Sequence, residues 1–153
     1  MSATPPSLKA RALRLLAQRE HSRSELVAKL SRHVQEGDDL PALLDALQAR
    51  GFIDETRVAE SVLHRRAPLL GAQRVLQELR RKGLSDDLVQ RAAVQLTGSE
   101  LERARAVWAR RFGGAPAADS PQERARQMRF LASRGFAADV VRRVVRGGRA
   151  DEL

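Results

Sequence analysis

The chain has 153 residues, a net charge of +9 and no cysteine, which excludes a disulfide and a thiolate-bound metal. It lacks the run of roughly 18 apolar residues that a membrane-spanning helix needs and begins without a signal pattern, so we expect a soluble, cytoplasmic protein with no membrane partner. The net charge rises from +1 in residues 1–54 (8 basic, 7 acidic) to +3 in 55–98 (8 and 5) and +5 in 99–153 (12 and 7), which favours an acidic or polyanionic partner.

The first third of the chain predicts three helices. Leucines at helical spacing indicate the first helix over residues 8–19 and the third over 40–50. Between them, Ser22 and Glu25 have the spacing of a capping box, which predicts the start of the second helix. The sequence QEGDD at 35–39 predicts the turn that separates the second helix from the third.

The middle third predicts three more helices. The first begins at Asp54 and ends near Arg66, because a proline follows two residues later and cannot continue a helix. The second covers residues 72–82, where valine and leucine recur at helical spacing. The third begins at Ser85, whose hydroxyl suits the cap position, and ends near residue 96.

The last third predicts a break and three further helices. Gly98 and Ser99 mark the break, because Ser99 and a glutamate three residues later form another capping-box pattern for a helix that ends at Phe112. Residues 113–120, which read GGAPAADS, predict an internal linker.

Two helices follow this linker. Ser120 and the proline after it predict the start of the eighth helix, which ends before Gly135. Residues 137–146 predict the ninth helix, with valines on one face and arginines on the other. We expect flexible tails at 1–7 and 147–153.

One helix junction occurs three times, as LQARGFIDETRV (47–58), LRRKGLSDDLV (79–89) and LASRGFAADVV (131–141). In each copy a glycine follows a basic residue, at the place where a left-handed residue ends a helix. Nine helices with this recurring junction predict an all-α fold. We expect three tandem three-helix modules, over 8–50, 54–96 and 99–146, in an elongated, curved helical-repeat arrangement.

Four stretches carry the most specific motifs: SRSELVAKL (22–30), GFIDETRVAESVLHRR (51–66), GAQRVLQELRRKGLSDDLVQRA (71–92) and FLASRGFAADVV (130–141). With these motifs the chain resembles the RecX family of recombinase regulators over residues 8–146. It departs from the family pattern at Val58 and Val62, where the family often has aromatic residues.

The resemblance implies three tandem three-helix modules in a protein that is not an enzyme. It implies binding to the RecA protein and to the groove of the RecA filament on single-stranded DNA. It also implies suppression of filament extension, ATP hydrolysis, strand exchange and co-protease activity. The sequence itself has no phosphate-binding loop, no nucleophile motif and no metal-ligand spacing among its histidines, so we expect no cofactor, metal or catalytic residue.

Basic residues are the candidates for binding a partner or a nucleic acid, because guanidinium groups bind phosphates and carboxylates. Aromatic residues are few, so we expect contacts to backbone phosphates or acidic side chains rather than stacking on bases. The candidates are Arg65, Arg66, Arg74, Arg80, Arg81, Lys82, Arg110, Arg111, Arg134, Arg142, Arg143 and Arg146.

Two other functions remain open at this point. The helix-turn-helix pattern of Ser22–Leu30 and Ser85–Leu96 suits a basic DNA-binding protein that acts without RecA. The other open function is that of a protein adaptor, whose arginine content then reflects only a GC-rich genome. We expect a monomer with weak, sequence-independent binding to single-stranded or double-stranded DNA. The sequence leaves open how contacts divide between RecA and DNA, and which module dominates.

Overall fold

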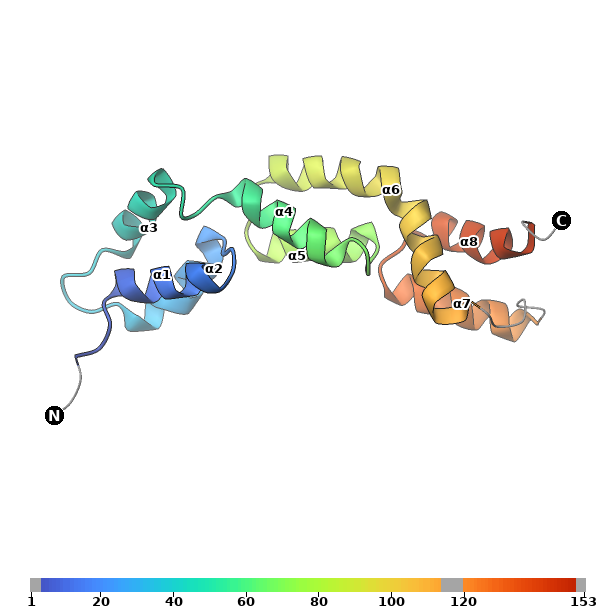
Figure 1. The fold of residues 1–153 in the computed structure, drawn as a ribbon, viewed down its shortest axis with the longest axis horizontal. Coiled ribbons are helices and arrows are strands. Elements are labelled where there is room, and N and C mark those ends of the chain that lie inside the picture. The colour runs from blue at the N-terminus through green and yellow to red at the C-terminus, as the bar shows by residue number, and fades with distance from the viewer. Residues whose placement is uncertain (1–3, 114–119, 151–153) are drawn as a thin grey trace.

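The computed structural model describes residues 4–113 and 120–150, and all the regular structure within these ranges is helical. The helices form an elongated, slightly curved row of three small bundles, with the first and last helices at opposite ends (Figure 1). This arrangement confirms the predicted all-α repeat of three-helix modules. Within the described ranges, no helix is both long and apolar enough to cross a lipid bilayer.

The first bundle consists of α1 (Leu8–Gln18), α2 (Arg23–Leu30), the short 3-10 helix η1 (Ser31–His33) and α3 (Leu40–Ala49). The capping box predicted for α2 is present. The hydroxyl of Ser22 accepts a hydrogen bond from the Glu25 backbone, and the Glu25 carboxylate accepts one from the Ser22 backbone. The core of this bundle contains Leu8, Ala12, Leu26, Leu30, Leu40, Leu44, Leu47 and Ile53.

The second bundle consists of α4 (Glu55–Arg66), α5 (Ala72–Arg81) and the first half of α6 (Asp86–Phe112). Asp54 and Ser85 cap α4 and α6, as the sequence predicts, because each side chain accepts a backbone N–H bond from the first turn. The core contains Val58, Ala59, Val62, Ala72, Val75, Leu79, Leu84, Val89, Ala92 and Leu96.

The third bundle consists of the second half of α6, α7 (Pro121–Ser133) and α8 (Ala138–Ala150). Ser120 caps α7 as predicted, and its hydroxyl accepts a 3.0 Å hydrogen bond from the Glu123 backbone. The core contains Ala104, Val107, Leu131, Phe136, Val140, Val141, Val144 and Val145.

The break predicted at Gly98 is wrong, because α6 runs without interruption from Asp86 to Phe112. A glycine inside a helix costs about 1 kcal/mol relative to alanine. Packing on both sides offsets this cost, because Leu96 lies in the second core and Ala104 in the third. Ser99 does not cap a new helix. Its hydroxyl is within hydrogen-bond distance of carbonyls of the preceding turn and accepts a 2.9 Å bond from Arg103 Nε.

The last helix is longer than predicted. Residues 147–150, assigned to a flexible tail, continue α8 as far as Ala150. Glycines at 147 and 148 lower helix stability but do not end a helix as a proline would. In the predicted N-terminal tail, residues 4–7 are described and lie before the start of α1. Of the remaining predicted tail and linker residues, 1–3, 114–119 and 151–153 lie outside the described residues.

The glycine junctions have the predicted backbone geometry. Gly51, Gly83 and Gly135 have φ angles of +81°, +76° and +91°, which is the left-handed region that glycine enters without steric cost. The residue after each glycine donates its N–H to the carbonyl five positions earlier, as Phe136 does to Leu131 at 3.3 Å. This is the hydrogen bond of a Schellman motif, so each junction ends its helix by the same means.

Candidate interaction surface

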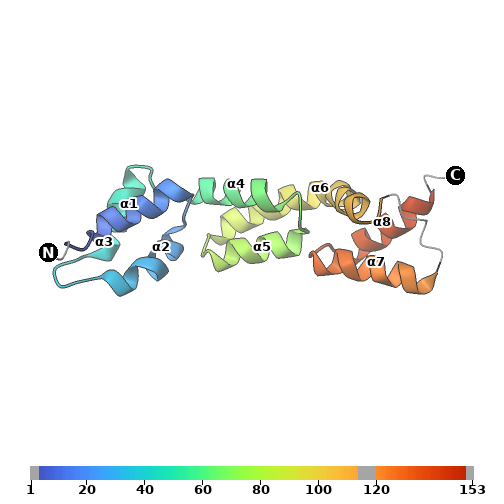
Figure 2. The same ribbon diagram turned by 60° about the horizontal axis from the view of Figure 1, so that its bottom comes forward.

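The bundles meet at two joints of similar design. At the first joint, Ser22 Oγ donates a 2.6 Å hydrogen bond to the carbonyl of Lys82. At the second, the Gly71 N–H donates a 2.7 Å bond to the carbonyl of Arg134. Ser22 and Gly71 are the N-caps of α2 and α5, whereas Lys82 and Arg134 are the C-caps of α5 and α7. The helices α2, α5 and α7 therefore lie end to end along one edge of the row (Figure 2), with their dipoles in favourable order.

A glutamate from the following bundle caps the N-terminus at each joint. Glu55 Oε1 on α4 accepts a 3.2 Å hydrogen bond from the Arg23 N–H. Glu100 Oε1, in the middle of α6, accepts bonds of 3.2 Å from the Ala72 N–H and 3.4 Å from the Ala137 N–H. Glu100 is buried and joins the starts of α5 and α8 to α6, so it fixes the spacing of the second and third bundles.

The second joint is also closely packed. A Cβ on Gly71 would overlap the backbone of Gly135, and a Cβ on Gly135 would overlap Arg74, so the two chain segments can approach this closely only because both residues are glycines. Arg103 on α6 donates hydrogen bonds to the carbonyls of Ala67 at 2.9 Å and Leu70 at 2.6 Å. These contacts hold the α4–α5 turn against α6, so the bundles on either side have a defined relative position.

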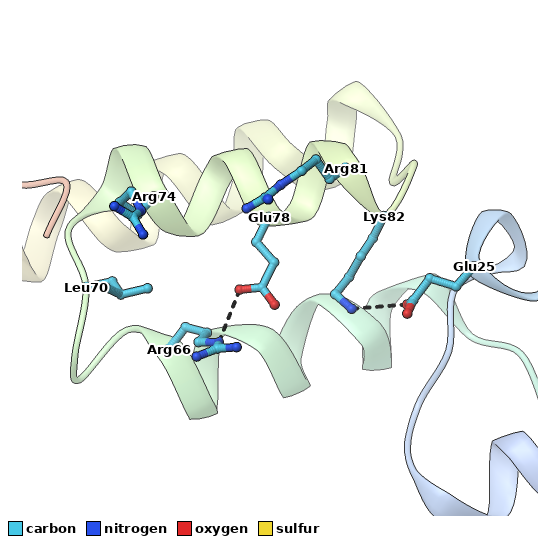
Figure 3. Close-up of a pocket in the computed structure, with 7 residues that line it drawn as sticks. All are labelled: Glu25, Arg66, Leu70, Arg74, Glu78, Arg81 and Lys82. Carbon is cyan, nitrogen blue, oxygen red and sulfur yellow. Dashed lines mark ion pairs between the residues drawn. The ribbon is translucent and has the colours of Figure 1, made fainter. Parts of the chain in front are cut away.

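A groove of about 460 Å³ lies between α4 and α5 (Figure 3). This α4–α5 groove is lined by Glu25, Arg66, Leu70, Arg74, Glu78, Arg81 and Lys82. Arg66 Nε lies 3.3 Å from Glu78 Oε2, and Lys82 Nζ lies 3.2 Å from Glu25 Oε1. Neither Arg74 nor Arg81 forms an ion pair with another described residue. The groove therefore carries an excess of positive charge that an anionic partner can neutralise.

Glu25 links this groove to the first joint. Burial raises the pKa of its carboxyl, but hydrogen bonds from Arg19, the Ser22 N–H and Lys82 outweigh burial and lower the pKa to about 2. The bond from Arg19 Nη2 to Glu25 Oε2 measures 2.7 Å. Glu25 is therefore ionised at neutral pH and holds Lys82 at the end of the groove.

A second depression, of about 340 Å³, lies where the α4–α5 turn meets the third bundle. This Phe130 pocket is lined by Leu69, Val107, Arg110, Arg111, Phe130 and Arg134. Arg110 Nη2 donates a 2.7 Å hydrogen bond to the Pro68 carbonyl. The guanidinium carbons of Arg111 and Arg134 lie 5.6 and 5.0 Å from the centre of the Phe130 ring, within the range of cation–π attraction.

The two depressions are neighbours in the structure. Leu70 lines the groove and Leu69, the residue before it, lines the pocket. Arg74 of the groove also donates a 2.8 Å hydrogen bond to the carbonyl of Ser133, which precedes Arg134 of the pocket. The structure thus brings together a subset of the predicted binding residues: Arg66, Arg74, Arg81, Lys82, Arg110, Arg111 and Arg134. The other candidates are exposed but line neither depression: Arg65, Arg80, Arg142, Arg143 and Arg146. We call the adjoining depressions the cationic surface.

Sequence reasoning missed a further basic depression, of about 340 Å³, on the first bundle. It is lined by Arg11, Arg14, Leu15, Lys29, Leu30, Arg32 and His33. The low net charge of residues 1–54 concealed it, because none of the seven acidic residues in this part of the sequence is among the residues that line the depression. Sequence reasoning also missed Leu69 and Phe130, whose place in the pocket depends on how the second and third bundles meet.

Comparison with known proteins gives consistent matches. Residues 54–92 match the family model described as "RecX, second three-helix domain", and 99–145 match "RecX, third three-helix domain". The chain is 49% identical over 146 residues to a protein named Regulatory protein RecX from Ralstonia nicotianae, covering 95% of this chain and 91% of the relative. A protein of the same name from Leptothrix cholodnii is 54% identical over 140 residues, covering 92% and 88%.

The fold is also that of a solved structure. A crystal structure of RecX from Lactobacillus salivarius superimposes with a TM-score of 0.74 at 20% sequence identity. The superposition covers 92% of this chain and 93% of that chain. The row of bundles is therefore an arrangement that this other protein shares along nearly its whole length.

Proposed function

The chain belongs to the RecX family of regulatory proteins, and from this premise we propose that it binds RecA and the RecA filament on single-stranded DNA. Bound there, it inhibits filament extension, ATP hydrolysis, strand exchange and co-protease activity. It acts in the cytoplasm as a monomer, and by binding rather than by catalysis.

The observation that carries this proposal is the cationic surface, which extends across the second joint from α4 to α7. A RecA filament on DNA offers repeated subunits and a phosphate backbone, so a partner spread over several bundles can contact more than one subunit at once. Modest contacts from each bundle then add to tight binding, because the later contacts form within the same complex. The hydrogen-bonded joints favour tight binding, because bundles that are already held at a fixed spacing lose little conformational freedom when they bind.

Inhibition follows from the same geometry. A rigid rod of bundles attached to adjacent subunits resists the change in their spacing that accompanies subunit addition or nucleotide turnover. Such a mechanism needs differential binding to one filament state, because a ligand that binds two states equally does not shift their equilibrium. Slowed ATP hydrolysis and slowed extension are therefore expected together.

The test is a titration of the purified protein against RecA on single-stranded DNA. We expect ATP hydrolysis and filament growth to fall with a common half-inhibitory concentration. Unchanged hydrolysis and growth over a wide range of protein concentration would reject the proposal. The same titration without RecA, followed by DNA mobility, shows how much binding is to DNA alone.

DNA binding without RecA is a second candidate, favoured by the further basic depression on the first bundle. With about five phosphate contacts, the logarithm of the binding constant should fall with the logarithm of salt concentration with a slope near −4 to −5. If the protein binds DNA with this slope but leaves RecA activity unchanged, this second function is the correct one. A filament interaction insensitive to salt would instead indicate a protein adaptor whose charge plays no part.

A further inference from the structure

The Phe130 pocket combines an apolar floor with a cationic rim. Leu69, Val107 and Phe130 form the floor, and Leu69 is 48% exposed although it is a large apolar side chain. The rim consists of Arg110, Arg111 and Arg134, and no acidic residue is among the described residues that line the pocket. The α4–α5 groove differs in this respect, because two carboxylates lie within it.

The guanidinium groups of the rim are held in position before any ligand arrives. Arg111 and Arg134 lie over the ring of Phe130, and Arg111 also lies 5.7 Å from the centre of the Phe112 ring. A guanidinium that stacks on a ring retains its in-plane N–H donors for a carboxylate or a phosphate. Arg110 is fixed by its bond to the Pro68 carbonyl. Little side-chain entropy remains to be lost when an anion binds.

The pocket suits an acidic peptide better than a nucleic acid. Two guanidiniums lie over the Phe130 ring, and the Phe112 ring packs edge-on against it, with 5.4 Å between the two ring centres. The Phe130 ring therefore offers little open face for a base to stack on. A phosphate backbone could contact the rim but would leave the exposed Leu69 without an apolar partner. A peptide with carboxylates around one large apolar side chain satisfies both the rim and the floor.

We infer that the Phe130 pocket binds an acidic segment of a partner protein that carries one leucine or phenylalanine among aspartates or glutamates. The apolar side chain contacts Leu69 and the parts of Val107 and Phe130 that line the pocket, and the carboxylates accept hydrogen bonds from Arg110 and Arg134. The inference rests on the proposed function in one respect, that the partner is the recombinase. Because Leu69 belongs to the second bundle and Phe130 to the third, the segment binds across the second joint.

Fluorescence anisotropy of the full chain with a labelled peptide tests the inference. The probe has one leucine between two short runs of aspartate, and its control has serine in place of the leucine. We expect the leucine peptide to bind on the order of tenfold more tightly, from burial of one leucine side chain. Unlabelled oligothymidylate should not displace it. Equal affinity of the two peptides, or ready displacement by oligothymidylate, would overturn the inference and indicate a general anion site.

Variants locate the binding. The L69S substitution changes a leucine in an exposed turn, and R134A removes a cation from the rim. Each substitution should lower the affinity for the leucine peptide by about five- to tenfold. R105A is the matched control, because Arg105 is an exposed arginine on α6 that does not line the pocket, and it should change the affinity by less than about twofold. An equal loss in all three variants would contradict the assignment to this pocket.

The peptide assay is independent of RecA. If the leucine peptide binds and L69S weakens it while RecA activity is unaffected by the protein, the pocket is confirmed and the proposed function fails. If RecA is inhibited equally by the wild type and by L69S, and the leucine and serine peptides bind alike, the proposed function holds and the pocket inference fails.

Discussion

Replacement of Glu100 by alanine tests whether the second joint is an integral part of the fold. The carboxylate is buried and accepts hydrogen bonds from the Ala72 and Ala137 N–H groups at 3.2 and 3.4 Å. Its loss leaves two donors at helix N-termini without a partner, and each unsatisfied buried group costs about 1–3 kcal/mol. Because both bonds are long, we take the lower half of this range and expect E100A to lose about 2–4 kcal/mol of unfolding free energy.

Urea unfolding of the full chain, followed by far-ultraviolet circular dichroism, measures this loss. E102A is the matched control, because Glu102 is an exposed glutamate on the same helix, and it should change the stability by less than about 0.5 kcal/mol. E100Q retains one acceptor oxygen and should lose about half as much as E100A. If E100A and E102A are equally stable, the carboxylate does not hold the joint and the reasoning is refuted.

Three further predictions concern stability. G98A should raise the free energy of unfolding by about 0.5–1 kcal/mol, because α6 is continuous there and a Cβ meets open space; thermal unfolding would show a decrease if the helix broke at this point. G135A should lower it by at least about 2 kcal/mol, because φ is +91° and a Cβ would overlap the Arg74 side chain; denaturant unfolding with unchanged stability would contradict this. Folding lowers the pKa of Glu25 from 4.5 to about 2, which corresponds to about 3 kcal/mol and, after discounting for solvent screening of this partly exposed group, to roughly 2 kcal/mol of stabilisation. This stabilisation is present above pH 4.5 and is lost as the pH falls toward 2; a difference between wild type and E25Q that did not shrink over this range would be inconsistent with the pairing.

Local signals in the sequence predicted most of the helix boundaries. Ser22, Asp54, Ser85 and Ser120 act as caps because a cap depends only on the residues of the first turn. The glycine junctions were predictable for the same reason, since a left-handed residue next to a helix end is a local requirement.

Gly98 shows where local signals fail. Gly98, Ser99 and Glu102 carry the pattern of one helix ending and another beginning, yet the helix continues. The outcome depends on Leu96 and Ala104, which pack into two different cores and favour one continuous helix between them. Such tertiary packing overrides a propensity cost of about 1 kcal/mol.

The joints and the cationic surface were beyond sequence reasoning for a different reason. Glu55 and Glu100 bond to backbone groups 32 and 28 positions away, and no local pattern marks such a contact. The sequence predicts the basic residues as candidates for a binding surface, but their grouping depends on how each bundle is rotated about the row. That rotation places Arg134 beside Arg110 and leaves Arg65 outside both depressions.

The central claim is that arginines of the cationic surface, rather than net charge, inhibit the RecA filament. The measurement is ATP hydrolysis by RecA on single-stranded DNA with two triple variants that remove the same charge. R81A/R111A/R134A changes residues of the groove and the pocket, and R65A/R80A/R142A changes exposed arginines that line neither.

We expect the first variant to raise the half-inhibitory concentration by at least about tenfold, and the second to stay within about twofold of the wild type. Both proteins should retain the helical circular dichroism of the wild type. An equal rise for the two variants would show that net charge alone is responsible, and no rise for either would show that the filament binds elsewhere; each result would contradict the account.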